Sequence, residues 1–184
     1  MTCPNDSVML KMHGGSVKLS LTMGQLYVAW RRWPIVWAEF NRIVNSKKRT
    51  IDDMTRVVYA ASCCAAAGEE REPRHDSIMS FRKDLPRGLD GIDAVYDAYV
   101  QLMPTESPGA LRETFERRAR SSNSSIRLPR FELETPVDYY VYLVVICGIS
   151  EDLFWEADYS FLWDVACSKG AFDSWLAGEH ERRR

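Results

Sequence analysis

The sequence contains few of the residue patterns that mark an enzyme or a metal-binding protein. It has no glycine-rich phosphate loop, no Gly-x-Ser-x-Gly, no His-Glu-x-x-His and no Cys-x-x-Cys. Its histidines, His13, His75 and His180, do not stand at metal-ligand spacing from the cysteines. Adjacent carboxylates such as Asp52 and Asp53 fall at expected helix ends, where capping explains them. An enzymatic role therefore lacks support, and we expect a non-enzymatic protein with no cofactor and no metal.

The cysteines and the apolar runs bear on the compartment. The 5 cysteines are odd in number, and Cys63 and Cys64 are adjacent in an alanine-rich segment, which does not fit the disulfide framework of a secreted domain. The start, MTCPNDSVML, lacks both the basic and the apolar part of a signal peptide. The longest apolar run, residues 139–149, is too short to cross a bilayer. We expect reduced, buried thiols, a cytoplasmic location and no membrane segment.

The charge balance argues against a general affinity for nucleic acid. The formal net charge is -2, so no global positive field surrounds the protein. The best candidate for a DNA-recognition helix, residues 111–120, contains several arginines, but Glu113 and Glu116 interrupt its positive charge. We expect no nucleic-acid partner, and a DNA-binding regulator remains an alternative.

The N-terminal part predicts a β-hairpin followed by helices. Apolar and polar residues alternate over residues 8–12 and 17–21, on either side of Gly14 and Gly15, which is typical of two antiparallel strands. Thr22 and Gln25 fit the capping box of a helix that runs to residue 33, where Pro34 breaks it. Further helices are expected over residues 35–44, 51–68, 76–84, 90–103 and 109–120, with Gly68 as a C-cap.

The C-terminal part predicts a second set of helices after a linker. Residues 121–125 are Ser-Ser-Asn-Ser-Ser, a linker composition, and residues 126–134 are expected to be irregular. We predict one helix over residues 137–147 that stops at Gly148, one capped by Ser150, one from Ser160 to about Gly170, and a last turn that ends at Gly178.

These patterns predict a mostly α protein with a short N-terminal β-hairpin followed by two helical modules. The hairpin and the first helical module occupy residues 1–120, the linker residues 121–134, and a C-terminal aromatic-rich helical module residues 135–184.

Large aromatic side chains are concentrated in the C-terminal module, where they serve either a core or an interface. Phe154 and Trp155 are neighbours in sequence, so they cannot point the same way from a helix, and at least one is expected to be partly exposed. Our hypothesis is that the exposed members of a set of five residues bind a partner, the alternative being that all five are core. The set is Leu153, Phe154, Trp155, Phe161 and Trp163.

Two stretches resemble a protein family. In residues 10–30, a strand pair leads into a helix with the pattern apolar-x-apolar-[Thr/Ser]-x-Gly-x-Leu. In residues 148–168, a turn with the pattern Gly-apolar-[Ser/Thr] precedes a Phe-Trp pair. Both stretches resemble the tail assembly chaperones of long-tailed bacteriophages. The acidic residue that the family usually has later in the helix of the second stretch is replaced here by the Leu-Trp-Asp of residues 162–164. The matching residues are Leu19, Leu21, Thr22, Gly24 and Leu26 in the first stretch, and Gly148, Ile149, Ser150, Phe154, Trp155 and Asp158 in the second.

The resemblance implies a non-catalytic role in phage or prophage assembly. Such chaperones coat the long tape measure protein in the host bacterial cytoplasm, help recruit the major tail protein, and are absent from the mature virion. Their front and back modules are often joined by a programmed frameshift. A groove that accepts the apolar faces of helices suits this role, and self-association is a further candidate contact. The alternative function is that of a small helical phage structural or adaptor protein.

Overall fold

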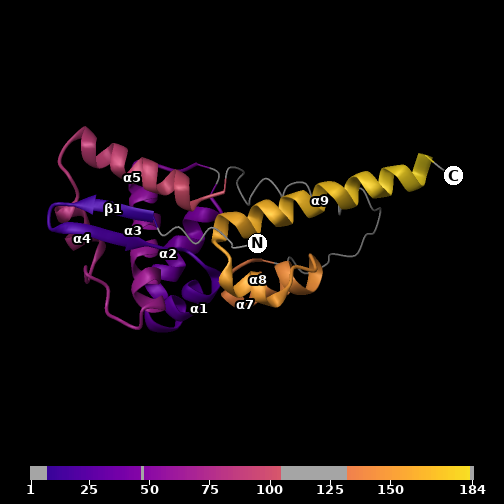
Figure 1. Cartoon of the computed structure of the whole chain (residues 1–184), viewed down its shortest axis with the longest axis horizontal. Coiled ribbons are helices and arrows are strands. Elements are labelled where there is room, and N and C mark those ends of the chain that lie inside the picture. The colour runs from indigo at the N-terminus through magenta and orange to yellow at the C-terminus, as the bar shows by residue number, and fades with distance from the viewer. Residues whose placement is uncertain (1–7, 47, 105–131, 183–184) are drawn as a thin grey trace.

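The computed structural model describes residues 8–46, 48–104 and 132–182 (Figure 1). The predicted fold class is confirmed, since an N-terminal hairpin precedes a chain that is otherwise helical in these ranges. The elements before residue 105 are β1 (Val8–Met12), β2 (Gly15–Leu19), α1 (Met23–Arg32), α2 (Pro34–Val44), α3 (Ile51–Gly68), α4 (Ile78–Asp84) and α5 (Leu89–Leu102). Those after residue 131 are α7 (Pro136–Tyr140), the π-helix η1 (Val141–Ile146), α8 (Glu151–Glu156) and α9 (Tyr159–Arg182).

The hairpin is confirmed in register and in the face that it buries. Leu10 pairs with Val17 and Met12 with Gly15, and Gly15 has the positive φ of 115° that the tight turn requires. The side chains of Leu10, Met12, Val17 and Leu19 are buried, while Met9 on the opposite face is exposed. Because two strands alone are marginal in water, the buried face needs a cover, and contacts with α3 and α5 supply it.

Capping and proline set the helix boundaries of the N-terminal half. The Thr22 hydroxyl accepts from the Gln25 amide at 3.2 Å, and the Gln25 side chain accepts from the Thr22 amide at 3.3 Å, which is the predicted capping box. Pro34 begins α2, so the break after α1 is also confirmed. The predicted cap at Gly68 is wrong by one residue. The C-cap is Glu69, and Gly68 instead lets the Gln25 side chain of α1 approach α3.

The elements after residue 131 pack on the same core as the N-terminal helices. The Trp37 indole N–H donates to the Glu134 carbonyl at 2.9 Å, and the Tyr139 hydroxyl donates to the Asn41 side chain at 2.7 Å. The Tyr159 amide donates to the Leu21 carbonyl at 2.7 Å. The predicted helix over residues 109–120 and the serine-rich residues 121–125 lie outside the described residues, so the boundary between two modules stays a prediction.

The predicted single helix over residues 137–147 is wrong in its second half. After α7 the chain widens into the π-helix η1, in which the Cys147 amide donates to the Tyr142 carbonyl at 2.9 Å. The widened segment is rich in valine and isoleucine, whose branched side chains lose freedom in an α-helix. It ends as expected at Gly148, which has a φ of 71°.

The predicted ends near Gly170 and Gly178 are wrong, because α9 runs without interruption from Tyr159 to Arg182. Neither glycine has a positive φ, and a Cβ added to either would meet nothing within 4 Å. An ion pair at 2.8 Å joins Lys169 to Asp173 across the first glycine. An isolated glycine is tolerated inside a helix, and α9 extends well past the other labelled helices and strands (Figure 1).

Gly170→Ala is expected to raise the free energy of unfolding by about 0.5–1 kcal/mol, because alanine has the higher helix propensity and the site has room for it. Urea unfolding followed by far-UV circular dichroism measures the change. A loss of stability would mean instead that the helix ends at residue 170 in a conformation that only glycine adopts easily.

Asp84 joins the turn of the hairpin to the end of α4. Its carboxylate accepts from His75 Nε2 at 3.0 Å and from the Gly14 amide at 3.1 Å, and it pairs with Arg74 at 3.0 Å. The hydrogen bond from His75, followed by that from Gly14, lowers the pKa of Asp84 below its usual value of 3.8. A depressed carboxyl pKa stabilises the fold above the unfolded-state value, and this contribution disappears as the pH falls through the folded-state value.

Asp84→Asn is accordingly expected to be less stable than the natural chain at pH 7, and the difference should shrink as the pH falls below about 4. Urea titrations of both proteins over a pH series test this. A stability difference that stays constant down to pH 3 would show that charge on Asp84 is not what stabilises the turn.

Candidate partner-binding surfaces

The five residues predicted to bind a partner divide into buried and accessible ones. Phe154 and Trp163 are 0% and 2% exposed, so they are not among the exposed members to which the hypothesis assigns a partner contact. Phe161 is 41% exposed, and Leu153 and Trp155 are half-buried. The neighbours Phe154 and Trp155 thus point to different surroundings, as their adjacency on a helix requires.

The two buried members belong to an aromatic core. Phe154 packs edge-on against Tyr140 at a centroid distance of 5.3 Å. Trp163 packs on Tyr139 at 6.3 Å and on Tyr159 at 6.1 Å. Such pairs stabilise a fold beyond the area that they bury. The C-terminal aromatic residues therefore hold α7, α8 and α9 together, and only part of the set remains for a partner.

Trp155 lies in an open, mainly apolar groove of about 520 Å³ between α1, α7 and α8. We call it the Trp155 groove, and it is lined by Tyr27, Val137, Tyr140, Glu151 and Trp155. The Trp155 ring lies edge-on to Tyr27 at 5.8 Å and stacks on Tyr140 at 5.8 Å. Tyr27, Val137 and Tyr140 are site residues that the sequence does not predict, because nothing in their spacing shows that three separate helices meet at one place.

A glycine allows α1 and α8 to form this groove. A Cβ on Gly24 would lie 2.9 Å from the backbone oxygen of Trp155, closer than real Cβ contacts. Gly24 is also one of the residues that carry the family resemblance. Its absence of a side chain brings Tyr27, one turn further along α1, against the Trp155 ring.

The polar groups of the groove are few. The Trp155 indole N–H donates to the Glu151 carboxylate at 3.4 Å. Burial, and then the charge of Glu151, raise the pKa of the Tyr140 hydroxyl, so it stays protonated at neutral pH. Aromatic walls with a single carboxylate are suited to holding an apolar side chain rather than to proton transfer.

The outer face of α9 is a second accessible apolar surface. Phe161, Phe172, Trp175 and Leu176 are all exposed, and the rings of Phe172 and Trp175 lie 5.8 Å apart. The 3.6-residue period places Phe161, Phe172 and Leu176 on one side of the helix. The sequence predicts a helix end near Gly170, between Phe161 and the other three residues, so it does not show that the four share one helix.

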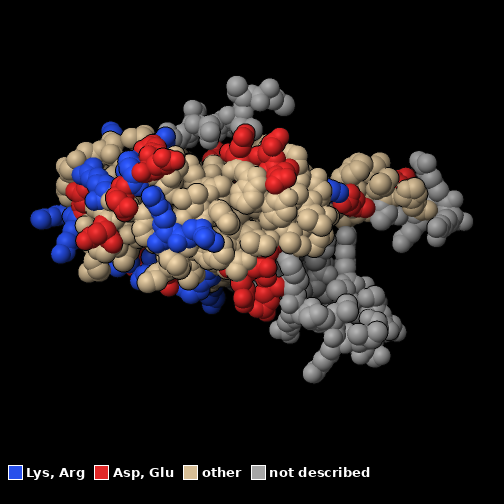
Figure 2. Space-filling model, turned by 90° about the horizontal axis from the view of Figure 1, so that it is seen from below, with Lys and Arg blue, Asp and Glu red and all other residues tan. Residues whose placement is uncertain are grey.

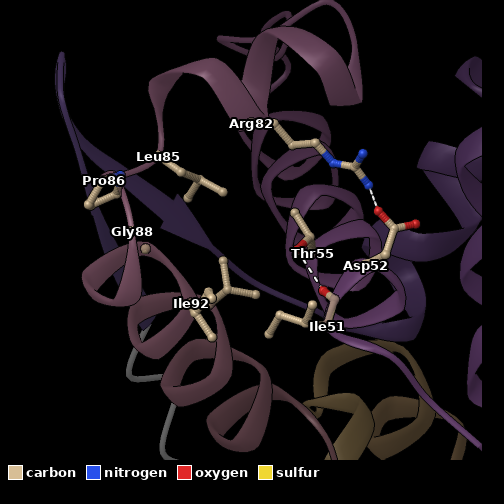
Figure 3. Close-up of a pocket in the computed structure, with 10 residues that line it drawn as sticks. Ile51, Asp52, Thr55, Arg82, Leu85, Pro86, Gly88 and Ile92 are labelled. Atoms are coloured by element: carbon tan, nitrogen blue, oxygen red, sulfur yellow. Dashed lines mark hydrogen bonds and ion pairs between the residues drawn. The ribbon is translucent and has the colours of Figure 1, made fainter.

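A third surface, the α5 groove, lies between α3, α4 and α5 and has a volume of about 270 Å³ (Figure 3). Ile51 and Ile92 point toward each other across it, and Leu85 lines its upper end in the view. An ion pair between Asp52 and Arg82 lies on the α3–α4 side. The sequence does not predict this groove, because its walls come from three helices.

The environments of Cys63, Cys64 and Cys147 do not favour reactive thiolates. Burial raises the pKa of Cys63 to about 11, and it raises those of Cys64 and Cys147 as well. These thiols are protonated at neutral pH and therefore weak nucleophiles. Within residues 8–46, 48–104 and 132–182 no group of three or more histidine, cysteine or acidic side chains is placed to hold a metal ion.

Charge is distributed without a single dominant sign on the face that carries α1, α7 and α8. Basic and acidic side chains are mixed at the end that holds the hairpin, and much of the middle of this face is uncharged (Figure 2).

In the part of the chain that the structure describes, no helix is long and apolar enough to cross a membrane. Comparisons of the chain with models of protein families, with curated proteins and with solved structures find no match.

Proposed function

We propose that this protein is a non-catalytic assembly chaperone of a phage or prophage tail, which binds the tape measure protein in the bacterial cytoplasm. The observation that carries the proposal is the Trp155 groove, an accessible aromatic surface to which both stretches that resemble tail assembly chaperones contribute, with Tyr27 from the first and Glu151 and Trp155 from the second. Recruitment of the major tail protein, and absence from the finished virion, belong to the same proposal.

The groove has the chemistry that such a partner needs. A tape measure protein is long and helical, so it presents many similar apolar faces before the tail forms. An apolar groove can hold one such face, as in other helix-in-groove complexes. Several copies of the chaperone on one long partner would give avidity although each contact is weak.

The test is co-expression of the full chain with the tape measure protein encoded beside it. We expect the tape measure protein to co-purify and to remain soluble only when the chaperone is present. A tape measure protein that is soluble alone and does not bind this chain would favour the alternative, a small structural or adaptor protein.

A matched pair of variants connects the result to the groove. Val137 lines the groove and Ile35 does not, yet each is exposed and follows a proline as the second residue of its helix. Aspartate at that position suits the positive end of the helix dipole, so neither Val137→Asp nor Ile35→Asp should destabilise the fold.

Val137→Asp is expected to reduce the co-purified tape measure protein at least about tenfold, because a charge would be buried without a partner. Ile35→Asp should leave it unchanged. Equal binding by both variants, with unchanged melting temperatures, would remove the Trp155 groove from the interface.

A further inference from the structure

The outward side of α5 carries a row of apolar side chains that the fold does not use. Leu89, Ile92, Tyr96 and Val100 are 74%, 46%, 51% and 54% exposed. Their spacing of three, four and four residues places them along one side of the helix. The opposite side of α5, with Val95, Ala98 and Leu102, is buried in the core. The fold is therefore satisfied without this row, and the row is available to a partner.

The row continues into the α5 groove, which makes the surface concave. Ile92 belongs to the row and also lines the groove, where it faces Ile51 of α3 (Figure 3). Ile51 is itself 41% exposed. A helix laid along α5 would thus contact the row and could insert an apolar side chain between Ile92 and Ile51.

Carboxylates border the row on the side away from the groove. Asp90, Asp93 and Asp97 are exposed, and none of them forms an ion pair with another described residue. Acidic residues on α3 differ, since Asp52 pairs with Arg56 and Asp53 with Arg42. The α5 surface therefore combines apolar contact with negative charge that is not neutralised by the described part of the chain.

We propose that the α5 groove binds a basic amphipathic helix of a partner protein. Apolar side chains of the partner, three to four residues apart, contact the row, and its lysine or arginine side chains pair with Asp90, Asp93 and Asp97. The row from Leu89 to Val100 covers about three helical turns, or roughly 16 Å, which sets the length of the partner segment. Charge complementarity selects a basic helix over an acidic one with the same apolar face.

This interface is separate from the one in the proposed function and does not rest on it. α5 lies at the upper edge of the molecule, and α1, α7 and α8, which form the Trp155 groove, lie at its lower edge (Figure 1). A partner on α5 would leave the Trp155 groove accessible, so the protein could hold two helical segments at once.

The test uses the full chain and two fluorescent synthetic peptides of about 18 residues, a length at which a helix can form. Both carry the same leucine face; one carries lysine along the flank of that face and the other glutamate. Fluorescence anisotropy should show the lysine peptide binding at least about tenfold more tightly than the glutamate peptide. Its affinity should fall as salt is raised, because salt screens exposed charge pairs.

Two double variants of equal net charge locate the binding. The double variant Asp93→Asn with Asp97→Asn should bind the lysine peptide about three- to tenfold more weakly, as expected for the loss of two exposed ion pairs. Asp152→Asn with Asp164→Asn, which removes the same charge from α8 and α9, should not change its affinity. Tyr96→Ala should lower the affinity for both peptides, because it removes a large apolar side chain from the row.

Four results would overturn the inference, the last of them in a control variant. The two peptides could bind equally well, or the two double variants could behave alike. Alternatively, sedimentation could show a dimer that Tyr96→Ala dissociates, which would assign the row to a second copy of this chain. Val137→Asp serves as a further control, since loss of lysine-peptide binding in that variant would place the peptide in the Trp155 groove instead.

Discussion

Trp163→Ala is expected to lower the free energy of unfolding by about 3–5 kcal/mol, the usual cost of removing a large buried aromatic side chain. Trp163 is 2% exposed and packs against Tyr139, Tyr142 and Tyr159. These contacts join α9 to α7 and η1, so the loss should affect the cooperative unfolding of the whole core. Urea denaturation followed by far-UV circular dichroism measures it without relying on tryptophan fluorescence.

The same helix provides the control for this prediction. Trp175 is 59% exposed, so Trp175→Ala should change stability by no more than about 0.5 kcal/mol. If both variants lost the same stability, the outer end of α9 would be packed against something, and the division of the aromatic residues into core and surface would be wrong.

Gly91→Ala is the second substitution with a large expected effect, a loss of about 2–3 kcal/mol. A Cβ at residue 91 would lie 2.1 Å from the carbonyl oxygen of Pro86, and a backbone atom cannot rotate away as a side chain can. The helix-propensity gain of alanine, about 1 kcal/mol, is too small to offset this clash. Because Pro86 and Gly91 line the α5 groove, its shape should change as well.

Comparison with Gly170→Ala checks the cause. Both substitutions replace a helical glycine, but only residue 91 has an obstacle within reach. If urea denaturation shows a lower free energy of unfolding for Gly91→Ala and a higher one for Gly170→Ala, close packing is the reason that residue 91 must be glycine. A gain of stability in both would mean that the turn from Pro86 to Gly91 can open without cost.

The secondary structure could be predicted where the signal is local. Alternation around Gly14 and Gly15, the capping box of Thr22 and the break at Pro34 each depend on residues within one turn, and the structure confirms all three. The predictions at Gly170 and Gly178 failed because glycine permits a helix end but does not impose one. Both glycines lie in open space and neither has a positive φ, so α9 continues through them.

The candidate site could be predicted only in part, for the same reason. The C-terminal aromatic residues were identifiable by composition, but which of them remain accessible depends on where Tyr139, Tyr140 and Tyr159 pack. The Trp155 groove adds Tyr27 from a helix more than a hundred residues earlier in the chain. The row on α5 could have been found from the spacing of Leu89, Ile92, Tyr96 and Val100, but that spacing alone is equally typical of a buried face.

Site-specific crosslinking tests whether the tape measure protein occupies the Trp155 groove, since it reports where a partner lies. A photoreactive amino acid is placed at residue 137, beside Trp155, and in a second protein at Met79, which is also exposed but lies on α4. Each is co-expressed with the neighbouring tape measure protein and irradiated. We expect a crosslink to the tape measure protein from residue 137 and none from residue 79. A complex that forms but crosslinks only from residue 79, or from neither position, would contradict that expectation.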